Sequence, residues 1–228
     1  MRILNEILNL FFPNLCLICH RPLIKGERQI CIKCLCDLPR TGFHKIKDNP
    51  VEQLYFGKFQ IEHATAYLKY EKGGNVQKIV HSLKYHDNME IGYILGREIA
   101  LELKADDSPL CDVDLLLPVP LHKRKMRKRG YNQSECIAKG ISSILNIPVD
   151  TNSLMRVANN DTQTHKSIYD RWINVSSIFK LVAPEALEGK HILLIDDVIT
   201  TGATSLACVE ELSRAKDTRI SILSLSAV

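Results

Sequence analysis

The stretch of sequence that decides the fold reads Ile192-Leu193-Leu194-Ile195-Asp196-Asp197-Val198-Ile199-Thr200-Thr201-Gly202-Ala203-Thr204. Its first four residues are apolar, which is typical of a strand buried on both faces. Two acids follow, and a loop of small and hydroxylated residues comes after them. Leu206, Val209 and Leu212 then recur at helical spacing. The stretch therefore predicts a buried strand, a polar loop and a helix.

This arrangement is suited to binding a phosphate ester. The first N–H groups of a helix have no partner within the helix, so they attract an anion. Gly202 lets the backbone approach the anion closely, and Thr200, Thr201 and Thr204 add hydroxyl donors. The two acids can accept hydrogen bonds from sugar hydroxyls. The alternative is a strand whose acids merely cap the next helix. The Gly-Lys-Ser/Thr and Gly-x-Gly-x-x-Gly motifs of other phosphate-binding loops are missing from this stretch.

Apolar residues elsewhere in the chain predict further helices and strands. Helices are indicated by three periodic sets, which are Val76-Ile79-Val80-Leu83, Ile91-Leu95-Ile99-Leu103 and Ile137-Ile141-Ile144-Leu145. Apolar runs at Asp114–Val119 and Ile220–Val228 indicate strands. Strands that alternate with helices predict an α/β fold, with a parallel sheet flanked by helices and ligands at the carboxyl ends of the strands. We assign this domain to residues 51–228.

Composition limits the remaining possibilities. The chain has 228 residues, a net charge of +4 and 45% hydrophobic residues, which is enough for one α/β domain and a small module. No apolar run of about 18 residues predicts a membrane span. Residues 1–13 predict an amphipathic helix that packs on its own protein, with a membrane or partner contact as the alternative. Because no export signal is evident, we expect a cytoplasmic protein.

Two CxxC pairs near the N-terminus predict a metal site. They are Cys16-Leu17-Ile18-Cys19 and Cys31-Ile32-Lys33-Cys34. Four thiolates form the tetrahedral set that zinc prefers, and they leave no position open for a substrate. The spacer is shorter than in common zinc ribbons, so Cys36 and His20 are alternative ligands, and a redox dithiol is the alternative function. We expect Cys16, Cys19, Cys31 and Cys34 to bind a structural Zn²⁺ in a zinc-ribbon-like module over residues 1–45.

A dense basic segment follows the predicted strand at Asp114–Val119. It reads Pro118-Val119-Pro120-Leu121-His122-Lys123-Arg124-Lys125-Met126-Arg127-Lys128-Arg129-Gly130-Tyr131-Asn132-Gln133-Ser134. Because it leaves a buried strand, it should emerge at the same carboxyl edge as the phosphate loop. Arginine is suited to bidentate contacts with phosphate. A solvated surface loop or a nucleic-acid patch is the alternative.

The decisive stretch resembles the phosphoribosyl diphosphate (PRPP) signature of type I phosphoribosyltransferases. The resemblance implies that Asp196 and Asp197 hold the ribose hydroxyls as the catalytic acids. It implies a phosphate loop made of Val198, Ile199, Thr200, Thr201, Gly202, Ala203 and Thr204. It also implies Mg²⁺ bound with PRPP, an acceptor that attacks the ribose C1, and departure of diphosphate. The diphosphate would be stabilised by Pro120, Leu121, Arg124, Lys125, Arg129 and Gly130.

The basic segment, together with Arg156, Gln163, Arg171, Asn174 and Phe179, is similar to the ComF family of ComFC-like proteins. That family also carries an N-terminal cysteine module, so the resemblance covers nearly the whole chain. It implies a role linked to natural competence and to DNA uptake or recombination. By the same resemblance, residues 159–174 correspond to a flexible hood over the site, which would include Gln163, Arg171 and Asn174.

Other functions are compatible with the same residues. A non-catalytic competence adaptor could keep the phosphate site, bind single-stranded DNA with its basic segment and bind competence proteins with its cysteine module. Tyr131 is the one aromatic residue beside the basic run, which gives little support for base stacking. A regulator that senses PRPP or another ribose 5-phosphate compound would use the same loop. The sequence identifies neither the acceptor nor the oligomeric state.

Overall fold

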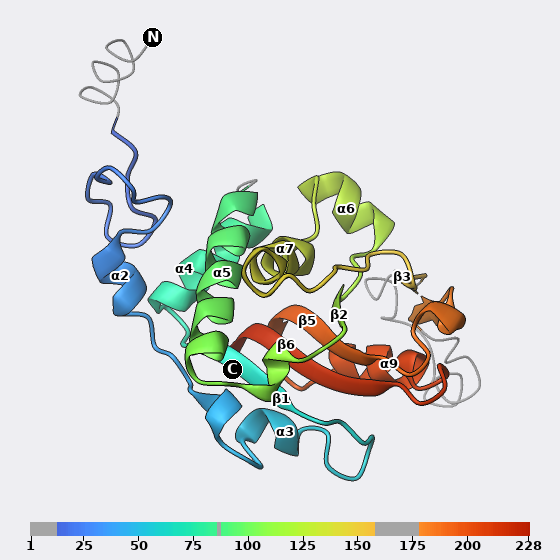
Figure 1. The fold of residues 1–228 in the computed structure, drawn as a ribbon. Helices are drawn as coiled ribbons and strands as arrows, with labels where there is room; N and C mark the ends of the chain where they lie inside the picture. Colours follow the sequence, from blue (N-terminus) through green and yellow to red (C-terminus); the bar gives the residue numbers. More distant parts are fainter. Residues whose placement is uncertain (1–12, 86–87, 158–177) are drawn as a thin grey trace.

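A parallel sheet forms the centre of the computed structural model, which describes residues 13–85, 88–157 and 178–228 (Figure 1). Within these ranges the sheet has four strands in the order β1-β6-β5-β2, and every pairing is parallel. The strands are β1 (Ala64–Lys69), β2 (Leu115–Pro118), β5 (His191–Ile199) and β6 (Arg219–Ala227). The predicted α/β class with a parallel sheet is confirmed.

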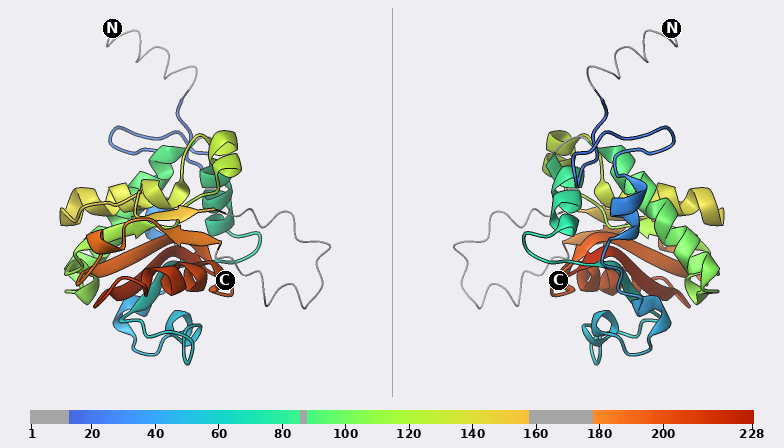
Figure 2. Two further views of the ribbon diagram at one scale, coloured as in Figure 1. Left: turned by 90° about the vertical axis from the view of Figure 1, so that its right-hand side faces the viewer. Right: turned by 90° about the vertical axis from the view of Figure 1, so that its left-hand side faces the viewer.

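Helices cover both faces of this sheet, as Figures 1 and 2 show. The longer helices are α4 (Asn75–Tyr85), α5 (Met89–Ala105), α7 (Gln133–Leu145) and α9 (Ala203–Leu212). Helices α4, α5 and α7 pack on the face that contains Leu193 and Leu223. Helix α9 and the short α3 (Pro50–Gln53) pack on the face that contains Leu194 and Ile222. Because alternate residues of β5 enter opposite layers, its sequence is continuously apolar from Ile192 to Ile195.

Glycines allow α5 and α7 to pack closely. A Cβ atom at Gly96 would lie 2.2 Å from the carbonyl oxygen of Ile137. A Cβ atom at Gly140 would lie 2.2 Å from the carbonyl oxygen of Tyr93. Real Cβ contacts are never this short, so any side chain at either position would push the helices apart. This contact fixes α7, whose first turn reaches the carboxyl edge of the sheet.

The elements expected from apolar spacing are present. The three periodic sets lie on α4, α5 and α7, and the run at Asp114–Val119 contains β2. The strand predicted before the acids is longer than expected, because β5 continues through Asp196 and Asp197 to Ile199. The pairing of β5 with β6 extends as far as Ile199 and Ala227, which explains the added length. The first part of the predicted loop is therefore strand.

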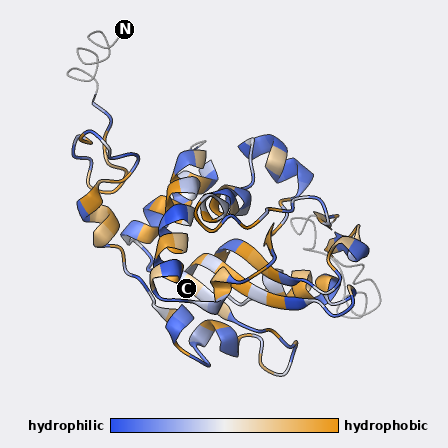
Figure 3. Cartoon of the chain, in the orientation of Figure 1, coloured by the Kyte–Doolittle hydropathy of each residue, from blue (hydrophilic) through white to orange (hydrophobic). Residues whose placement is uncertain are grey.

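The basic segment forms a helix rather than a loop. Helix α6 (Lys123–Arg129) begins after His122, whose Nδ1 accepts a hydrogen bond from the Arg124 N–H at 3.2 Å. It ends at Gly130, which has a left-handed φ of 75°. Lysine and arginine are good helix formers, and a left-handed glycine is a common helix end. Figure 3 shows α6 as mainly hydrophilic.

A small hairpin and several short elements complete the described fold. Strands β3 (Leu154–Arg156) and β4 (Phe179–Leu181) pair in antiparallel fashion beside the main sheet, and the sequence analysis did not anticipate them. The remaining short elements are α2 (Ile32–Cys36), η1 (Phe43–Lys45), η2 (Pro109–Cys111) and η4 (Pro184–Ala186). None of the described helices has the length and apolar character that a membrane crossing requires.

The cysteine module packs on α4 and α5. Ile18 and Ile30 belong to the same buried cluster as the apolar faces of these helices. Gln29 joins the two parts through polar contacts, because its Nε2 donates to Glu90 at 2.7 Å and its Oε1 accepts from Asn88 at 2.8 Å. We keep the division between residues 1–45 and 51–228 as a proposal. The amphipathic helix predicted for residues 1–13 lies, up to residue 12, outside the described residues.

Candidate functional site

The two acids lie where β5 extends beyond its neighbour β2. The pairing with β2 ends at Pro118 and Ile195, so Asp196 and the residues after it pair with β6 alone. Asp196 is buried, and its Oδ1 accepts hydrogen bonds from the Asp197 N–H at 2.8 Å and from the Ser134 hydroxyl at 3.5 Å. Strand β5 and the first turn of α7 thus position the carboxylates at the carboxyl edge of the sheet.

Burial and repulsion change the ionisation of this pair. Burial, followed by the negative charge of Asp197, raises the pKa of Asp196 to about 7. Lys84, in the last turn of α4, lies with its Nζ 3.0 Å from Asp197 Oδ2 and supplies a compensating charge. Lys84 was not predicted, because nothing in the spacing of the chain links a single basic residue at the end of α4 to the acids on β5.

The loop after β5 forms a small cradle at the N-terminus of α9. Gly202 has a left-handed φ of 72° and is the residue that precedes the helix. The loop encloses a cavity of about 40 Å³, lined by Asp196 and by Val198, Ile199, Thr200, Thr201, Gly202, Ala203, Thr204 and Ser205. All of the predicted phosphate-loop residues therefore lie around one cavity. The free N–H groups at the start of a helix suit an anion at this place.

Tyr55 supports the loop through a hydrogen bond to Ser205, and the sequence did not predict this contact. Its hydroxyl lies 2.6 Å from the Ser205 hydroxyl, which donates to the carbonyl oxygen of Gly202 at 2.9 Å. Since the Ser205 proton is used there, Tyr55 must be the donor in the first contact. Burial raises the pKa of Tyr55 to about 12, so the phenol keeps its proton. Tyr55 lies in the turn after α3, and nothing in the sequence around it predicted this role.

The residues predicted to bind diphosphate lie in three places. Pro120 and Leu121 line a cavity of about 260 Å³ beside the end of β2. The Arg129 guanidinium lies 5.5 Å from the centre of the Tyr85 ring, next to Lys84 in sequence, and donates to Gln133 at 3.0 Å. The others are Arg124 and Lys125, on α6, and Gly130, at its end. No hydrogen bond or ion pair within the described ranges joins Arg124 to the acids.

The predicted hood falls outside the described residues. Gln163, Arg171 and Asn174 all lie between residues 158 and 177, so their positions stay predictions. The residues that flank this range are paired, because Arg156 on β3 is opposite Phe179 on β4. The Arg156 guanidinium lies 5.4 Å from the centre of the Phe179 ring. Two residues that carry the family resemblance are therefore in contact.

The four predicted cysteines form one cluster. The sulfur atoms of Cys16, Cys19, Cys31 and Cys34 all lie within 4.8 Å of one another. The Cys31 N–H donates to the Cys16 sulfur at 3.4 Å, and the Cys34 N–H donates to the Cys31 sulfur at 3.4 Å. Burial opposes ionisation of Cys31, but hydrogen bonds from the Cys34 N–H and from Arg21 lower its pKa to about 6. The cluster is suited to a metal ion, since thiolates are the ligand form.

Known proteins resemble this chain over most of its length. The DNA utilization protein YhgH of Shigella flexneri is 28% identical over 206 residues, which cover 84% of this chain and 87% of that protein. Competence protein F of Haemophilus influenzae is 37% identical over 92 residues, or 40% of each chain. Competence protein ComFC of Bacillus subtilis is 37% identical over 90 residues, or 40% of this chain and 34% of that protein. The chain is therefore similar to proteins of the ComF/YhgH family.

Two further comparisons give less information about this chain. No protein-family model matches it. Its structure overlaps with the glutamine PRPP amidotransferase of Bacillus subtilis complexed with ADP and GMP, at 20% identity and a TM-score of 0.43. The overlap covers 63% of this chain and 30% of that one. Because this overlap is partial, the reading of the site rests on its own geometry.

Proposed function

We propose that this protein binds PRPP with Mg²⁺ at the carboxyl edge of its sheet and transfers the phosphoribosyl group to an acceptor. The observation that carries this proposal is the proximity of an acid pair to an anion cradle. Asp196 and Asp197 stand directly before the loop that encloses the cavity at the start of α9. A ribose 5-phosphate group needs both parts, because its hydroxyls donate to carboxylates and its phosphate accepts from N–H groups.

The proposed reaction needs no nucleophile on the protein. The acceptor attacks the ribose C1, the bond from C1 to the diphosphate oxygen breaks, and the diphosphate leaves with both electrons of that bond. Asp196 and Asp197 hold the ribose hydroxyls and lie near the positive charge that develops at C1. Arg129, which is held over Tyr85 beside Lys84, stabilises the departing diphosphate. Mg²⁺, a cation that prefers oxygen ligands, would neutralise the diphosphate when bound with PRPP.

Calorimetry tests the binding step directly. We would titrate PRPP with Mg²⁺ into the purified protein, beside ribose 5-phosphate and AMP. We expect Mg²⁺-dependent binding of PRPP that the double substitution Asp196→Asn with Asp197→Asn abolishes while the circular dichroism spectrum stays unchanged. A folded double variant that binds PRPP normally would rule out the proposed site. Where binding is seen, release of diphosphate in the presence of trial acceptors tests the transfer.

A second candidate is a DNA-binding adaptor in competence, and α6 is the observation that favours it. Within this helix Lys123, Arg124, Arg127 and Lys128 are exposed and no acid is present. The names of the relatives, DNA utilization protein and competence protein, are compatible with a nucleic-acid partner and with competence proteins as further partners. Both candidates are compatible with the predicted cytoplasmic location.

The adaptor candidate predicts a steep salt dependence. We expect labelled single-stranded DNA to bind with an affinity that falls as salt rises. Glutamine at the four exposed positions of α6 should reduce the slope of log affinity against log salt concentration by about three. The acid pair on β5 provides the matched control, since Asp196→Asn should leave DNA binding unchanged. If the α6 variant binds DNA as the wild type does, this helix is not the DNA contact.

We further propose that the cysteine cluster binds Zn²⁺ and that this metal is structural. All four sulfur atoms would be used as ligands, so no position is left for water or a substrate. Within the described residues, Cys36 and His20 are not part of the cluster. Cys36 is exposed, and it lies at the end of α2.

A further inference from the structure

A second and larger cavity lies at the opposite edge of the sheet from the acids. It has a volume of about 580 Å³ and is lined by residues 43–48, 56–57, 59–65 and 108–110, together with Glu52. These segments adjoin the beginning of β1 and the turn before β2, whereas the acids lie where the strands end. The volume falls in the range of about 300–1,000 Å³ that is usual for small-molecule sites. The cavity is therefore separate from the phosphate cradle.

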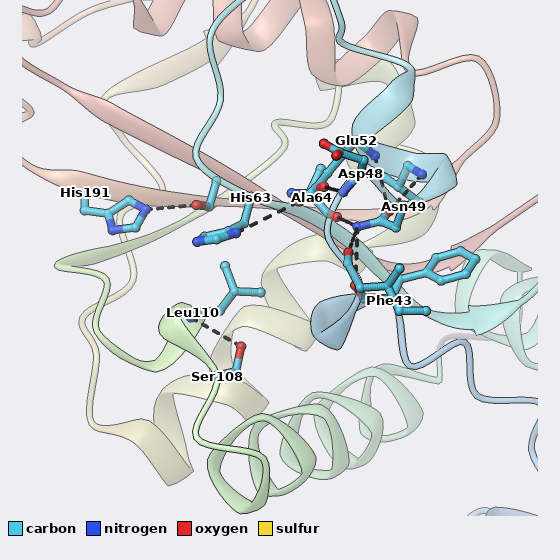
Figure 4. A network of polar contacts seen from close by, with 12 residues as sticks. Phe43, Asp48, Asn49, Glu52, His63, Ala64, Ser108, Leu110 and His191 are labelled. Carbon is cyan, nitrogen blue, oxygen red and sulfur yellow. Dashed lines mark hydrogen bonds and ion pairs between the residues drawn. The ribbon is translucent and has the colours of Figure 1, made fainter.

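Hydrogen bonds hold the walls of this cavity in place (Figure 4). The amide of Asn49, which is buried, donates to the carbonyl oxygens of Phe43 at 3.3 Å, Ile46 at 3.1 Å and Ala64 at 2.9 Å. These contacts tie the loop around η1 to the start of β1. On the other side, Asp106 pairs with His44 at 2.9 Å and with Lys45 at 2.7 Å. The site is preformed rather than a gap between loose loops.

The apolar part of the lining is aromatic. Phe43, Phe56 and Phe59 line the cavity, and the side chains of Ile61 and Leu110 add aliphatic surface. Phe56 is 56% exposed, so its ring is accessible to a ligand in the cavity. Aromatic rings favour stacking with another planar group. The lining therefore suits a planar ligand.

The polar part of the lining includes a hydroxyl with no partner. Thr65 is 3% exposed, and its Oγ1 has no hydrogen-bond partner within the described residues. Such a buried group usually costs stability, so its presence in a cavity wall indicates a ligand that would satisfy it. His63 also lines the cavity, with its Nδ1 4.0 Å from Glu52 Oε1. These groups can both donate and accept hydrogen bonds.

The charges of the lining disfavour an anion. Lys45 is already paired with Asp106, and Lys47 is the other lysine in a lining that contains three acids. The acids in the lining are Asp48, Glu52 and Glu62. We infer that this cavity binds a neutral planar nitrogen heterocycle of the size of a nucleobase or nucleoside, stacked on the phenylalanines and hydrogen-bonded to Thr65. A phosphorylated form of the same ligand binds more weakly, because its phosphate meets these carboxylates.

Adenosine and AMP serve as matched probes in calorimetry and ligand-observed NMR with the full chain. We expect saturable binding of adenosine and an affinity for AMP that is lower by about tenfold. Thr65→Val removes the hydroxyl at constant shape, so it should weaken adenosine binding about five- to tenfold while the melting temperature holds or rises. Phe56→Ala, at an exposed position, should weaken it as well. PRPP binding should be unchanged in both variants.

The double variant Asp196→Asn with Asp197→Asn separates this inference from the proposed function. It should bind adenosine as the wild type does, whether or not PRPP binding is ever seen. The inference is overturned if adenosine shows no saturable binding, if AMP binds more tightly than adenosine, or if Thr65→Val and Phe56→Ala leave adenosine binding unchanged. It is also overturned if adenosine binding is lost in the double variant, because the ligand would then occupy the carboxyl edge.

Discussion

Asp196 is a buried carboxyl whose pKa lies near 7 instead of 3.8, because burial and the charge of Asp197 disfavour its ionised form. Between these two values the folded state binds its proton more tightly than the unfolded state does. Stability therefore falls as pH rises through this window. Replacing this carboxyl with an amide, which cannot ionise, should prevent that loss of stability.

The corresponding prediction concerns Asp196→Asn without ligand. We expect the variant to be more stable than the wild type by about 4 kcal/mol near pH 8, with a gain that shrinks towards pH 5. Urea denaturation followed by circular dichroism at several pH values measures this. A gain of the same size at every pH would mean that the substitution acts through packing and not through ionisation.

Removing the Lys84 ammonium group should lower the stability of the protein, whereas Asp196→Asn should raise it. Lys84→Met leaves the Asp197 carboxylate, whose side chain is 14% exposed, without the ammonium group that lies 3.0 Å away. We expect a loss of about 1–3 kcal/mol near pH 8 and a smaller loss in acid, measured by the same denaturation series. Lys139→Met is the control, because Lys139 pairs with Glu135 at 2.6 Å but is 61% exposed. Its loss should stay below about 0.5 kcal/mol.

At the scale of elements, the junction of β5 and α9 depends on the left-handed conformation of Gly202. A Cβ atom there would lie 3.4 Å from the Tyr55 hydroxyl, which is an ordinary contact, so the cost of an alanine comes from its φ of 72°. We expect Gly202→Ala to lose about 1–2 kcal/mol of stability and to weaken PRPP binding as well. Denaturation and calorimetry measure the two effects.

Gly189 offers a matched control for this substitution. It has a φ of 69°, and a Cβ atom there would meet nothing within 4 Å. Gly189→Ala should therefore lose a similar amount of stability and leave PRPP binding unchanged. If both variants bind PRPP equally well, the conformation of the loop before α9 does not matter for the ligand, and the proposed cradle is wrong.

The elements were predictable where their signal is local. The spacing of Ile91, Leu95, Ile99 and Leu103 defines a helix face without any tertiary information, and α5 is where it predicts. The added length of β5 was not predictable, because it comes from pairing with β6, a strand that is distant in sequence. The helical form of the basic segment was missed because its charge suggested a loop. The lysines and arginines, which are good helix formers, and the helix-ending Gly130 were the features that could have predicted the helix.

At the scale of the whole molecule, one sequence segment predicted the acids and the loop of the site. The residues that support them from other parts of the chain were not predictable. The acids, the threonines and Gly202 are consecutive in sequence, so their grouping follows from the chain itself. Tyr55, in the turn after α3, and Lys84, on α4, reach the same site through contacts that depend on how the layers pack. The cavity beside Thr65 is likewise formed by several separate segments, and no motif marks it.

The cysteine module should contribute to the stability of the whole molecule as well as to its own. Ile18 and Ile30 share one buried cluster with residues of α4 and α5, so loss of the metal would expose apolar surface of the main domain as well. A contribution of about 3 kcal/mol, as from a ligand at about 100 times its Kd, corresponds to a fall in Tm of about 6–12 °C. Chelation of the metal should produce this fall.

Two substitutions on α2 test which sulfur atoms bind the metal. Cys34 belongs to the cluster, whereas Cys36, two residues later, is exposed and lies outside it. Cys34→Ser should lose bound zinc, measured by native mass spectrometry, and should melt at the temperature of the chelated protein. Cys36→Ser should keep both the metal and the Tm of the wild type. Zinc loss from the Cys36 variant would show that the fourth ligand has been misassigned, and retention by both variants would mean that three cysteines suffice.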